Sequence, residues 1–468
     1  MITLTKSTLK KIIYRLTAKV LFLVTVYSTE IPNEFFQFQS QKLYIDSGSN
    51  WQSNTIFGPV RYAKLNDKTD SLKINARFGS SIFNDRKAIY AYGLFRFKKY
   101  FHGYLYPRIV DSPNNFRGFS GIPRDIKRGG FTSGETDLSG ISFENDWMII
   151  QFGRGRQSWG AGSEIELAIS EKSNSYDYGM IDLDFDRLKV RYFHGYLETD
   201  SNFVNRYITG RGIEWNNNRN LLVGLSEIII YSGKDRAIDF AYFNPMSTHL
   251  EIELNNRQNR SGTDGGNGVW QISLDYLIMD NLKFSCNFLF DEFILDNQQK
   301  DKGKESANAY SLKTVYTPIK KDNSLLLCYF SLIGVGTNTF RHENGENNFV
   351  QRNNPLGWEI GSDSKEIKFG LGWLYKKKII TEVKLGQRNI GEKNFIKNLY
   401  APYDNYRHES FPSGDINNIN FVSTGLHWWW KPNIAFFIDM EYNDADQSRS
   451  EFKSIFGIDI FYGINRTL

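Results

Sequence analysis

Several features are scarce in this chain of 468 residues. Its two cysteines, Cys286 and Cys328, are too few for a disulfide framework, and each lies on the apolar side of an alternating run. We therefore expect buried or lipid-facing thiols rather than a disulfide. No stretch beyond the N-terminal region has about 18 continuous apolar residues, which excludes a transmembrane helix. The net charge of +5 is too small to indicate nucleic-acid binding.

Catalytic and metal-binding motifs are lacking as well. The six histidines show no zinc-type spacing, and neither a nucleophile elbow nor a phosphate-binding loop occurs. Asp182, Asp184 and Asp186 have the spacing of a calcium loop but lack its glycine and distal glutamate, so they predict the polar face of a strand. We expect no enzyme activity, no metal and no cofactor.

Aromatic residues, in contrast, make up 15% of the chain, and period-two alternation recurs along it. In 72–78, 188–192 and 367–373, apolar residues alternate with charged residues, polar residues or glycine. A charge facing lipid costs roughly 2–4 kcal/mol at the midplane of a membrane, so the charged face of a spanning strand must point into a wet interior. Aromatic residues near strand ends predict girdles at the membrane interfaces: Tyr100, Phe101, Tyr104, Tyr106 and Trp428 to Trp430.

The connections between these runs are of two kinds. Short turns, such as 216–218 and 431–433, contrast with long polar loops at 296–308, 340–355 and 390–420. This contrast is typical of an outer-membrane barrel. We predict an all-β fold, a single antiparallel up-and-down transmembrane β-barrel of about 16–18 strands over residues 29–468. Residues 1–28, with a basic start and a short apolar core, predict a signal peptide.

The stretch from Trp147 to Ser170 combines a strand with closely spaced glycines, arginines and a tryptophan. Arginine is a planar donor fork and tryptophan a flat stacking surface, so Arg154, Arg156 and Trp159 could bind a sugar or an anion. The alternative is a strand bend in the interior, held by arginine–carboxylate pairs.

The same stretch resembles the signature of the Wzi-type capsule assembly family of outer-membrane proteins. The pattern is Gly-Arg-x4-Trp-Gly-x-Gly followed by Leu-x-x-Ser, with Gly153, Gly160, Gly162 and Ser170 at its fixed positions. Four further stretches extend the resemblance in order: 212–231, Phe243-Asn244-Pro245, 291–293 and 354–363.

The resemblance implies an 18-stranded outer-membrane barrel that acts as a lectin for capsular polysaccharide. It also implies a small helical bundle at the periplasmic end, for which the sequence shows no clear helical stripe. Carboxylates could accept hydroxyls of the sugar, and arginines could bind acidic sugars, although the same residues could instead form ion pairs that fill the barrel. The candidate binding residues are Arg154, Arg156, Trp159, Glu214, Glu227, Asp291 and Glu292, and the motif residues are Gly153, Gly160, Gly162, Ser170, Asn244 and Pro245.

We therefore expect a non-catalytic protein of the bacterial outer membrane that binds or anchors a surface polysaccharide and supports capsule assembly. Its expected partners are that polysaccharide, outer-membrane lipid and the barrel-assembly machinery. A general diffusion channel shares every feature of the barrel and is the first alternative. A lipid-modifying enzyme of the outer membrane and a soluble carbohydrate-binding sandwich are the others.

Overall fold

The computed structural model describes residues 30–467 except 50, 52–53, 60–71, 99, 117, 120, 123, 125–126, 255–264, 293–300, 302–305, 403–409 and 448. The predicted signal peptide, residues 1–28, lies outside the described residues. Among the residues described, no helix is long and apolar enough to cross a membrane.

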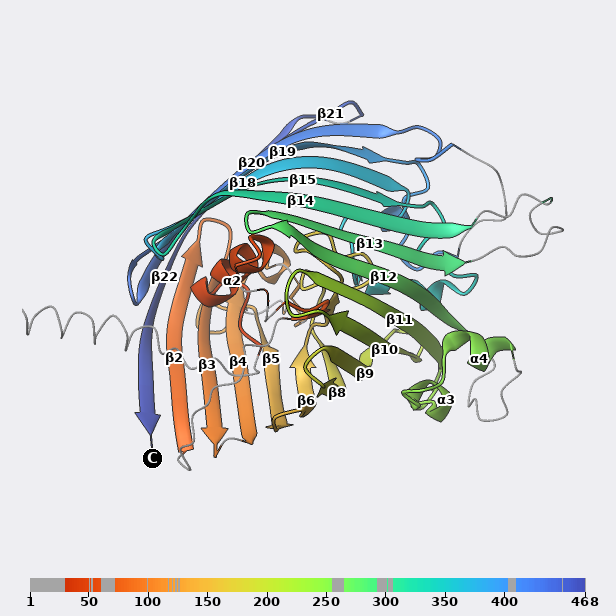
Figure 1. Ribbon diagram of the computed structural model, residues 1–468, viewed down its shortest axis with the longest axis horizontal. Helices are drawn as coiled ribbons and strands as arrows, with labels where there is room; N and C mark the ends of the chain where they lie inside the picture. Colours follow the sequence, from red (N-terminus) through yellow and green to blue (C-terminus); the bar gives the residue numbers. More distant parts are fainter. Residues whose placement is uncertain are drawn as a thin grey trace, which may run out of the picture.

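A closed antiparallel barrel forms the wall of the protein (Figure 1). Eighteen strands of the described chain take part, and β22 closes the ring by pairing with β2, which confirms the predicted fold class. The strands are β2 (Leu72–Phe83), β3 (Lys87–Phe97), β4 (Phe101–Asp111), β5 (Ser133–Glu144), β6 (Met148–Gly155), β8 (Tyr176–Asp184), β9 (Leu188–Thr199), β10 (Val204–Asn216), β11 (Leu221–Lys234), β12 (Gly266–Met279), β13 (Leu282–Glu292), β14 (Ala307–Lys321), β15 (Ser324–Val335), β18 (Ser364–Tyr375), β19 (Ile379–Ile390), β20 (Asn417–Lys431), β21 (Ile434–Ala445) and β22 (Glu451–Thr467).

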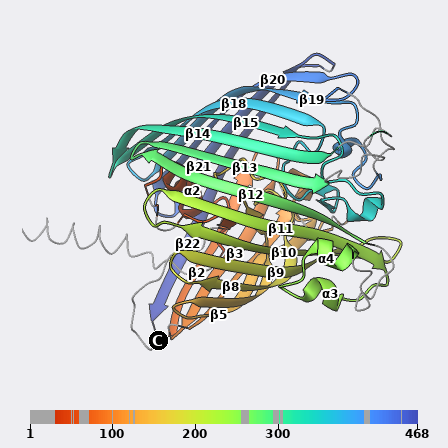
Figure 2. The same cartoon turned by 45° about the vertical axis from the view of Figure 1, so that its right-hand side comes forward.

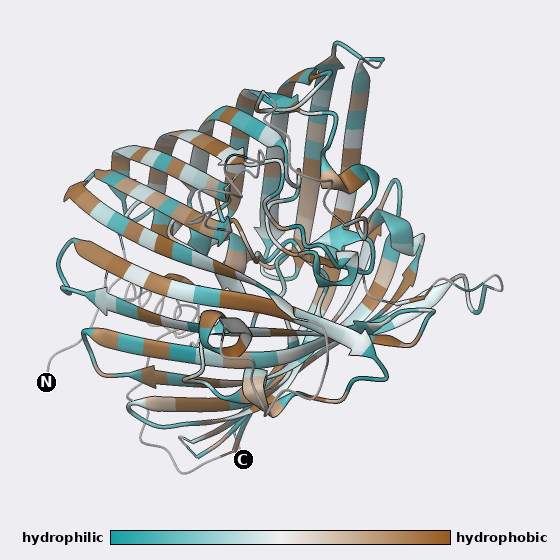
Figure 3. Ribbon diagram, turned by 90° about the vertical axis from the view of Figure 1, so that its right-hand side faces the viewer, coloured by the Kyte–Doolittle hydropathy of each residue, from teal (hydrophilic) through white to brown (hydrophobic). Residues whose placement is uncertain are grey.

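The two faces of the wall differ as the alternation predicts. On β18, Ile367 and Phe369 are exposed on the outside, whereas Glu366 and Lys368 are buried on the inside. Figure 3 shows this alternation of hydropathy along most of the strands. The outer face is therefore an apolar belt, and the inner face carries the charges. Both cysteines are free thiols, as expected.

The connections divide the barrel into two ends. Every strand-to-strand connection at one end is a turn of two to four residues, and every long loop lies at the other end. We call these the short-turn end and the long-loop end. Since short turns face the periplasm in barrels of this kind, the long-loop end faces outward from the cell.

Three segments of the chain fill the interior, and we call them the inner plug: the described part of residues 30–59, residues 156–175 and residues 336–363. Their backbones pair with one another in part, because β1 (Phe57–Gly58) of the first segment pairs with β7 (Ser158–Trp159) of the second. β16 (Val350–Gln351) and β17 (Asn354–Pro355) form a hairpin in the third.

Among its described residues, the inner plug contains one α-helix, α2 (Phe36–Asp46), which lies inside the wall near the short-turn end (Figure 1). Leu43 packs in a buried cluster with Leu327 and Leu374 of the wall. Asp46 accepts a hydrogen bond of 2.6 Å from the ammonium of Lys313. This helix was not predicted from the sequence, because both its apolar and its polar faces are in contact with the barrel interior.

Part of the predicted aromatic girdle is wrong. Tyr104, Tyr106 and Trp429 point inward and are buried, whereas Phe101 and Trp428 point outward. The alternation of strands β4 and β20 places consecutive residues on opposite faces, so an aromatic cluster in the sequence is divided between lipid and plug.

Trp429 and Trp428 therefore form a matched pair for mutation. The ring of Trp429 contacts Phe36 of α2 at 4.9 Å between centroids. We expect W429A to lower the free energy of unfolding by about 3–5 kcal/mol, because it leaves a cavity beneath the helix. W428A removes a ring that faces lipid, and lipid can fill the space. It should therefore lower the free energy of unfolding much less than W429A does. Urea titration in lipid vesicles measures both, and equal losses would contradict the inward orientation of Trp429.

Candidate functional site

The Gly-Arg-Trp stretch leaves the wall at the end of β6 and enters the interior. A Cβ atom on Gly153 would lie 2.2 Å from the carbonyl oxygen of Ser139 on the neighbouring strand, so only glycine fits there. Gly160 and Gly162 both have positive φ, and Gly162 at φ +74° turns the chain across the barrel. The motif glycines thus allow the chain to pass from strand β6 of the wall into the inner plug.

Trp159 is fully buried in the inner plug. Its ring meets Phe57 at 4.8 Å and Phe193 at 5.2 Å between centroids, and its indole nitrogen donates to Gln157. Phe57 belongs to the first plug segment and Phe193 to the wall, so Trp159 joins the two. Both faces of the indole are therefore covered by protein in this structure.

The two arginines of the stretch have different surroundings. Arg156 is buried and forms a bidentate ion pair with Asp137, and it also donates to the carbonyl of Ser173. Arg154 is on the outward-facing side near the long-loop end, where its Nε lies 3.8 Å from the carboxylate of Asp177 and one quarter of its side chain is exposed. Arg156 therefore holds the interior together, and Arg154 remains partly accessible.

The wall separates two of the predicted carboxylates. Glu214 points inward and accepts hydrogen bonds of 2.8 Å from the Thr55 hydroxyl and 2.9 Å from the Ile56 amide. Glu227 points outward, where its carboxylate lies 3.3 Å from Nε of Arg211. These two residues cannot contact one ligand together.

The remaining predicted residues are also dispersed. Asp291 accepts a hydrogen bond from the backbone amide of Phe340, at the start of the third plug segment. The side chain of Glu292 lies outside the described residues. Asn244 and Pro245 are exposed on the outside of the barrel. A common ligand-binding role for the predicted set stays a prediction.

Two stretches of the resemblance, almost 200 residues apart in sequence, do meet in the inner plug. The hydroxyl of Ser170 donates to the carbonyl of Gly357 at 3.0 Å, and the Ser170 amide donates to Leu356 at 2.9 Å. The amide of Trp358 donates to Leu167 at 2.9 Å. The motif residues therefore join the second plug segment to the third.

A network of buried charges ties α2 to the second plug segment and to the wall. Lys42 lies 2.8 Å from Glu171 and 3.8 Å from Glu164, and Glu164 lies 2.9 Å from Lys384. Burial opposes ionisation of Glu171, but the Lys42 ammonium outweighs it and lowers the pKa of Glu171 to about 2. Burial, and next the Glu171 carboxylate, raises the pKa of Glu166 to about 8. Glu166 is therefore protonated at neutral pH.

The space beside this network is small. A cavity of about 70 Å³ lies between α2, the first plug segment and the Gly-Arg-Trp stretch, with Lys42, Glu166 and Glu171 on its walls. It holds a few water molecules, since each needs roughly 10–15 Å³ on this measure, but no sugar ring.

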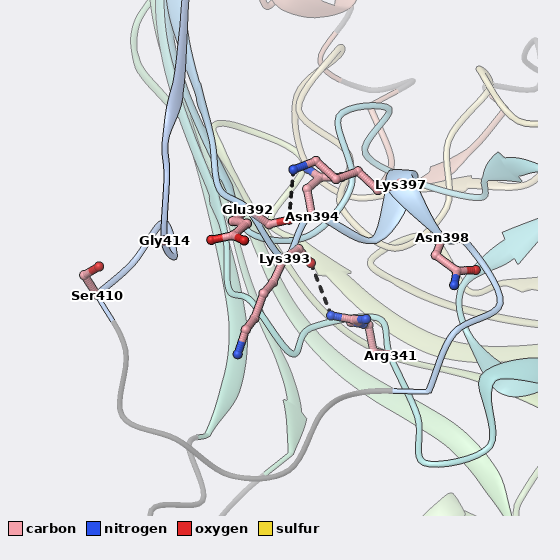
Figure 4. A pocket seen from close by; sticks show the side chains of 8 residues that line it. All are labelled: Arg341, Glu392, Lys393, Asn394, Lys397, Asn398, Ser410 and Gly414. Atoms are coloured by element: carbon pink, nitrogen blue, oxygen red, sulfur yellow. Dashed lines mark hydrogen bonds between the residues drawn. The ribbon is translucent and has the colours of Figure 1, made fainter. Parts of the chain in front are cut away.

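A larger pocket of about 600 Å³ opens at the long-loop end (Figure 4). Two long loops build it, residues 336–363 and 391–416. Its residues were not among the predicted site residues, because they lie on two loops about 50 positions apart and match no motif. The lining residues are Arg341, Glu392, Lys393, Asn394, Lys397, Asn398, Ser410 and Gly414.

Charge of one sign dominates this pocket, with three cations and one carboxylate. Arg341 donates to the carbonyl of Lys393 at 3.2 Å, which fixes the two loops against each other. Lys397 donates to the carbonyl of Glu392 at 2.9 Å within the second loop. Asn394 donates 2.7 Å hydrogen bonds to the carbonyls of Ile360 and Ser362. Figure 4 shows Arg341, Lys393 and Lys397 around one space, which suits an anion or an acidic sugar.

No candidate metal centre accompanies these sites in the part of the chain that the structure describes. No group of three or more histidine, cysteine, aspartate or glutamate residues there is placed to hold a metal ion. The closed antiparallel wall, its outer apolar belt and its charged interior define the class: the chain is a β-barrel protein of the bacterial outer membrane.

Among solved structures, the chain is similar to Wzi of Escherichia coli, described as an outer-membrane protein involved in group 1 capsule assembly and as a carbohydrate-binding β-barrel. The TM-score is 0.59 at 12% sequence identity, with 84% of each chain covered. OprD of Pseudomonas aeruginosa (TM-score 0.44, 10% identity, 84% of this chain and 95% of that chain) and OccAB4 of Acinetobacter baumannii (0.45, 8%, 86% and 100%) are further similar structures. No protein-family model and no curated protein matches the sequence.

The raised pKa of Glu166 predicts a pH dependence of stability. The ordinary pKa is 4.5, and the folded value is about 8. Between these values the folded protein binds a proton that the unfolded chain lacks, so stability falls as pH rises through this window. We expect E166Q to be more stable than the wild type at pH 9, by on the order of a few kcal/mol, and unchanged at pH 4. Thermal unfolding followed by circular dichroism measures this, with the exposed E451Q as control.

Proposed function

We propose that this protein is a non-catalytic outer-membrane barrel that binds or anchors a surface polysaccharide, such as a capsule, and supports its assembly. The observation that carries the proposal is the filled interior. The similarity to Wzi, whose description names carbohydrate binding and capsule assembly, supports the choice of ligand class. The barrel-assembly machinery would insert the protein, and outer-membrane lipid would surround its belt.

The filled interior argues against a wide diffusion path. Phe57, Trp159, Leu356 and Trp358 come from all three plug segments, and each is at most 5% exposed. They belong to one buried cluster that also includes Phe193 of the wall. A diffusion channel keeps a polar, water-filled lumen, whereas an apolar core inside the ring excludes water from much of the cross-section.

The pocket at the long-loop end supplies a surface for the polysaccharide, because that end faces away from the cell. The guanidinium of Arg341 can bind a sugar carboxylate with two donors, and the ammonium groups of Lys393 and Lys397 add charge. Arg154, partly exposed on the outer side of β6 near the same end, does not line this pocket. Arg156 and Trp159 would act by holding the plug segments in place.

A diffusion channel remains the second candidate, since the barrel has the strand number of a porin-sized pore. We expect purified protein in planar lipid bilayers to show no large, steady conductance, because the inner plug occupies the lumen. Deletion of residues 30–49, which removes α2, should raise the conductance and serves as the control that protein has inserted. A wide, steady pore in the intact protein would favour the channel.

Polysaccharide binding tests the proposal directly. We expect the purified protein to bind acidic polysaccharide from the surface of its own host, and R341A/K397A to weaken this binding at least about tenfold, because each charge-assisted hydrogen bond contributes roughly 1.5–3 kcal/mol. Glycan titration by biolayer interferometry gives the affinities.

The matched control is R219A, which removes one exposed arginine at the short-turn end. It should bind like the wild type. Equal weakening by R219A would indicate adsorption by net charge alone, and no binding by the wild type would reject the proposed function.

A further inference from the structure

A row of polar side chains faces outward from the wall, where lipid is expected. Arg211 of β10 and Glu227 of β11 are paired in register and lie 3.3 Å apart at Nε and Oε2. Ile208 of β10 and Ile228 of β11 have the opposite orientation and point into the buried core inside the barrel. Two residues further toward the short-turn end, Ile213 is 43% exposed on the outer face. The ion pair thus sits directly beside the apolar belt.

Residues 235–254 cover this row, and we call them the outer flap. The flap contains the short helices α3 (Phe240–Phe243) and α4 (His249–Leu254), which lie on the outside of the wall in two views (Figures 1 and 2). The ring of Tyr242 stacks on that of Tyr231 of the wall, with centroids 4.5 Å apart. The flap is therefore packed against the barrel rather than extended into water.

Outward-facing side chains of the wall hold the backbone of the flap. Glu227 accepts from the amide of His249 at 2.8 Å, and Arg211 donates to the carbonyl of Asn244 at 3.2 Å. Tyr192 donates to Phe243 at 2.6 Å, and Tyr207 donates to Arg236 at 2.8 Å. These polar residues on the lipid side of the wall are thus explained by attachment of the flap.

The free side of the flap is apolar. Five of its exposed residues have large hydrophobic side chains, which would be unfavourable in water and are close to one another in sequence. They are Ile238 (50% exposed), Phe240 (79%), Phe243 (46%), Met246 (83%) and Leu250 (50%). Among the described side chains of the flap, the exposed charged residues are Asp235, at its start, and Glu251.

The length of the apolar run on β11 indicates that this surface of the flap lies in lipid. On β11 the uncovered outward residues are Leu221, Val223 and Leu225, which span only about 14 Å along the strand at roughly 3.4 Å per residue. On β18 the exposed run from Ile367 to Trp373 spans about 20 Å. The apolar run on β11 is thus about 6 Å shorter than that on β18, and the flap lies just beyond Leu225, where it can supply the missing apolar surface.

We propose that the outer flap is embedded in the hydrocarbon of the membrane on the long-loop side, with lipid acyl chains as the partner of Phe240, Met246 and Leu250. The flap completes the belt over β9–β12 and shields the Arg211–Glu227 pair from lipid. This inference holds whether the barrel binds a polysaccharide or conducts solutes.

Site-specific fluorescence tests the location of the flap. In a C286A/C328A background, M246C carries the environment-sensitive dye NBD, and the protein is reconstituted in phosphatidylcholine vesicles. We expect a blue-shifted emission that doxyl-labelled phosphatidylcholine quenches and aqueous iodide does not. Met246 is 83% exposed, so its replacement should leave the fold intact.

Two matched positions calibrate the measurement. L225C lies in the belt on β11 and should behave like M246C, whereas N202C, in the exposed turn between β9 and β10, should emit as in water and be quenched by iodide. Emission from M246C that matches N202C would overturn the proposal. Shielding of M246C from both quenchers, together with a dimer in cross-linking, would also overturn it, because a second copy would then cover the flap.

Discussion

Hydrocarbon offers no hydrogen bonds and solvates no charge, and the whole architecture follows from this constraint. Every backbone group of the wall must find a partner on a neighbouring strand, so the sheet closes through the β2–β22 pair. Every charge of a strand must find water or a counter-charge away from lipid, so Lys368 and Glu366 pair inside the barrel at 3.2 Å. The alternation in the sequence, the closure of the sheet and the polar interior are thus all consequences of contact with hydrocarbon.

The same constraint creates the need for the inner plug. A ring of eighteen strands is too wide for its own side chains to fill, and the charges on its inner face require partners. Residues brought in from other parts of the chain supply them: Asp46 binds Lys313, and Glu164 binds Lys384. A buried ion pair adds little to stability by itself. It does specify the position of the segments that carry the two charges, because moving them apart would leave each charge buried and unpaired. The network therefore sets where α2 and the second plug segment lie.

The outer flap is the converse case. Here charges and tyrosine hydroxyls lie on the lipid side, and the chain folds a second layer over them instead of removing them. Arg211 and Glu227 therefore lie between two layers, the wall and the flap, as core residues do. The barrel is therefore a single sheet around most of its circumference and a covered sheet over β9–β12.

The sequence by itself determined the membrane barrel, a strand number of about 16–18, the two kinds of ends and the free thiols, because each depends on local period-two patterns and loop lengths. Alternation fails from Glu227 to Tyr231, where both faces of β11 are buried, and so the sequence did not reveal that Glu214 and Glu227 face opposite sides. Helix α2 lacked an apolar stripe because a polar interior surrounds it. Only the tertiary structure decided these points and the pocket of Arg341, Lys393 and Lys397, since contacts between distant loops leave no periodic trace in the chain.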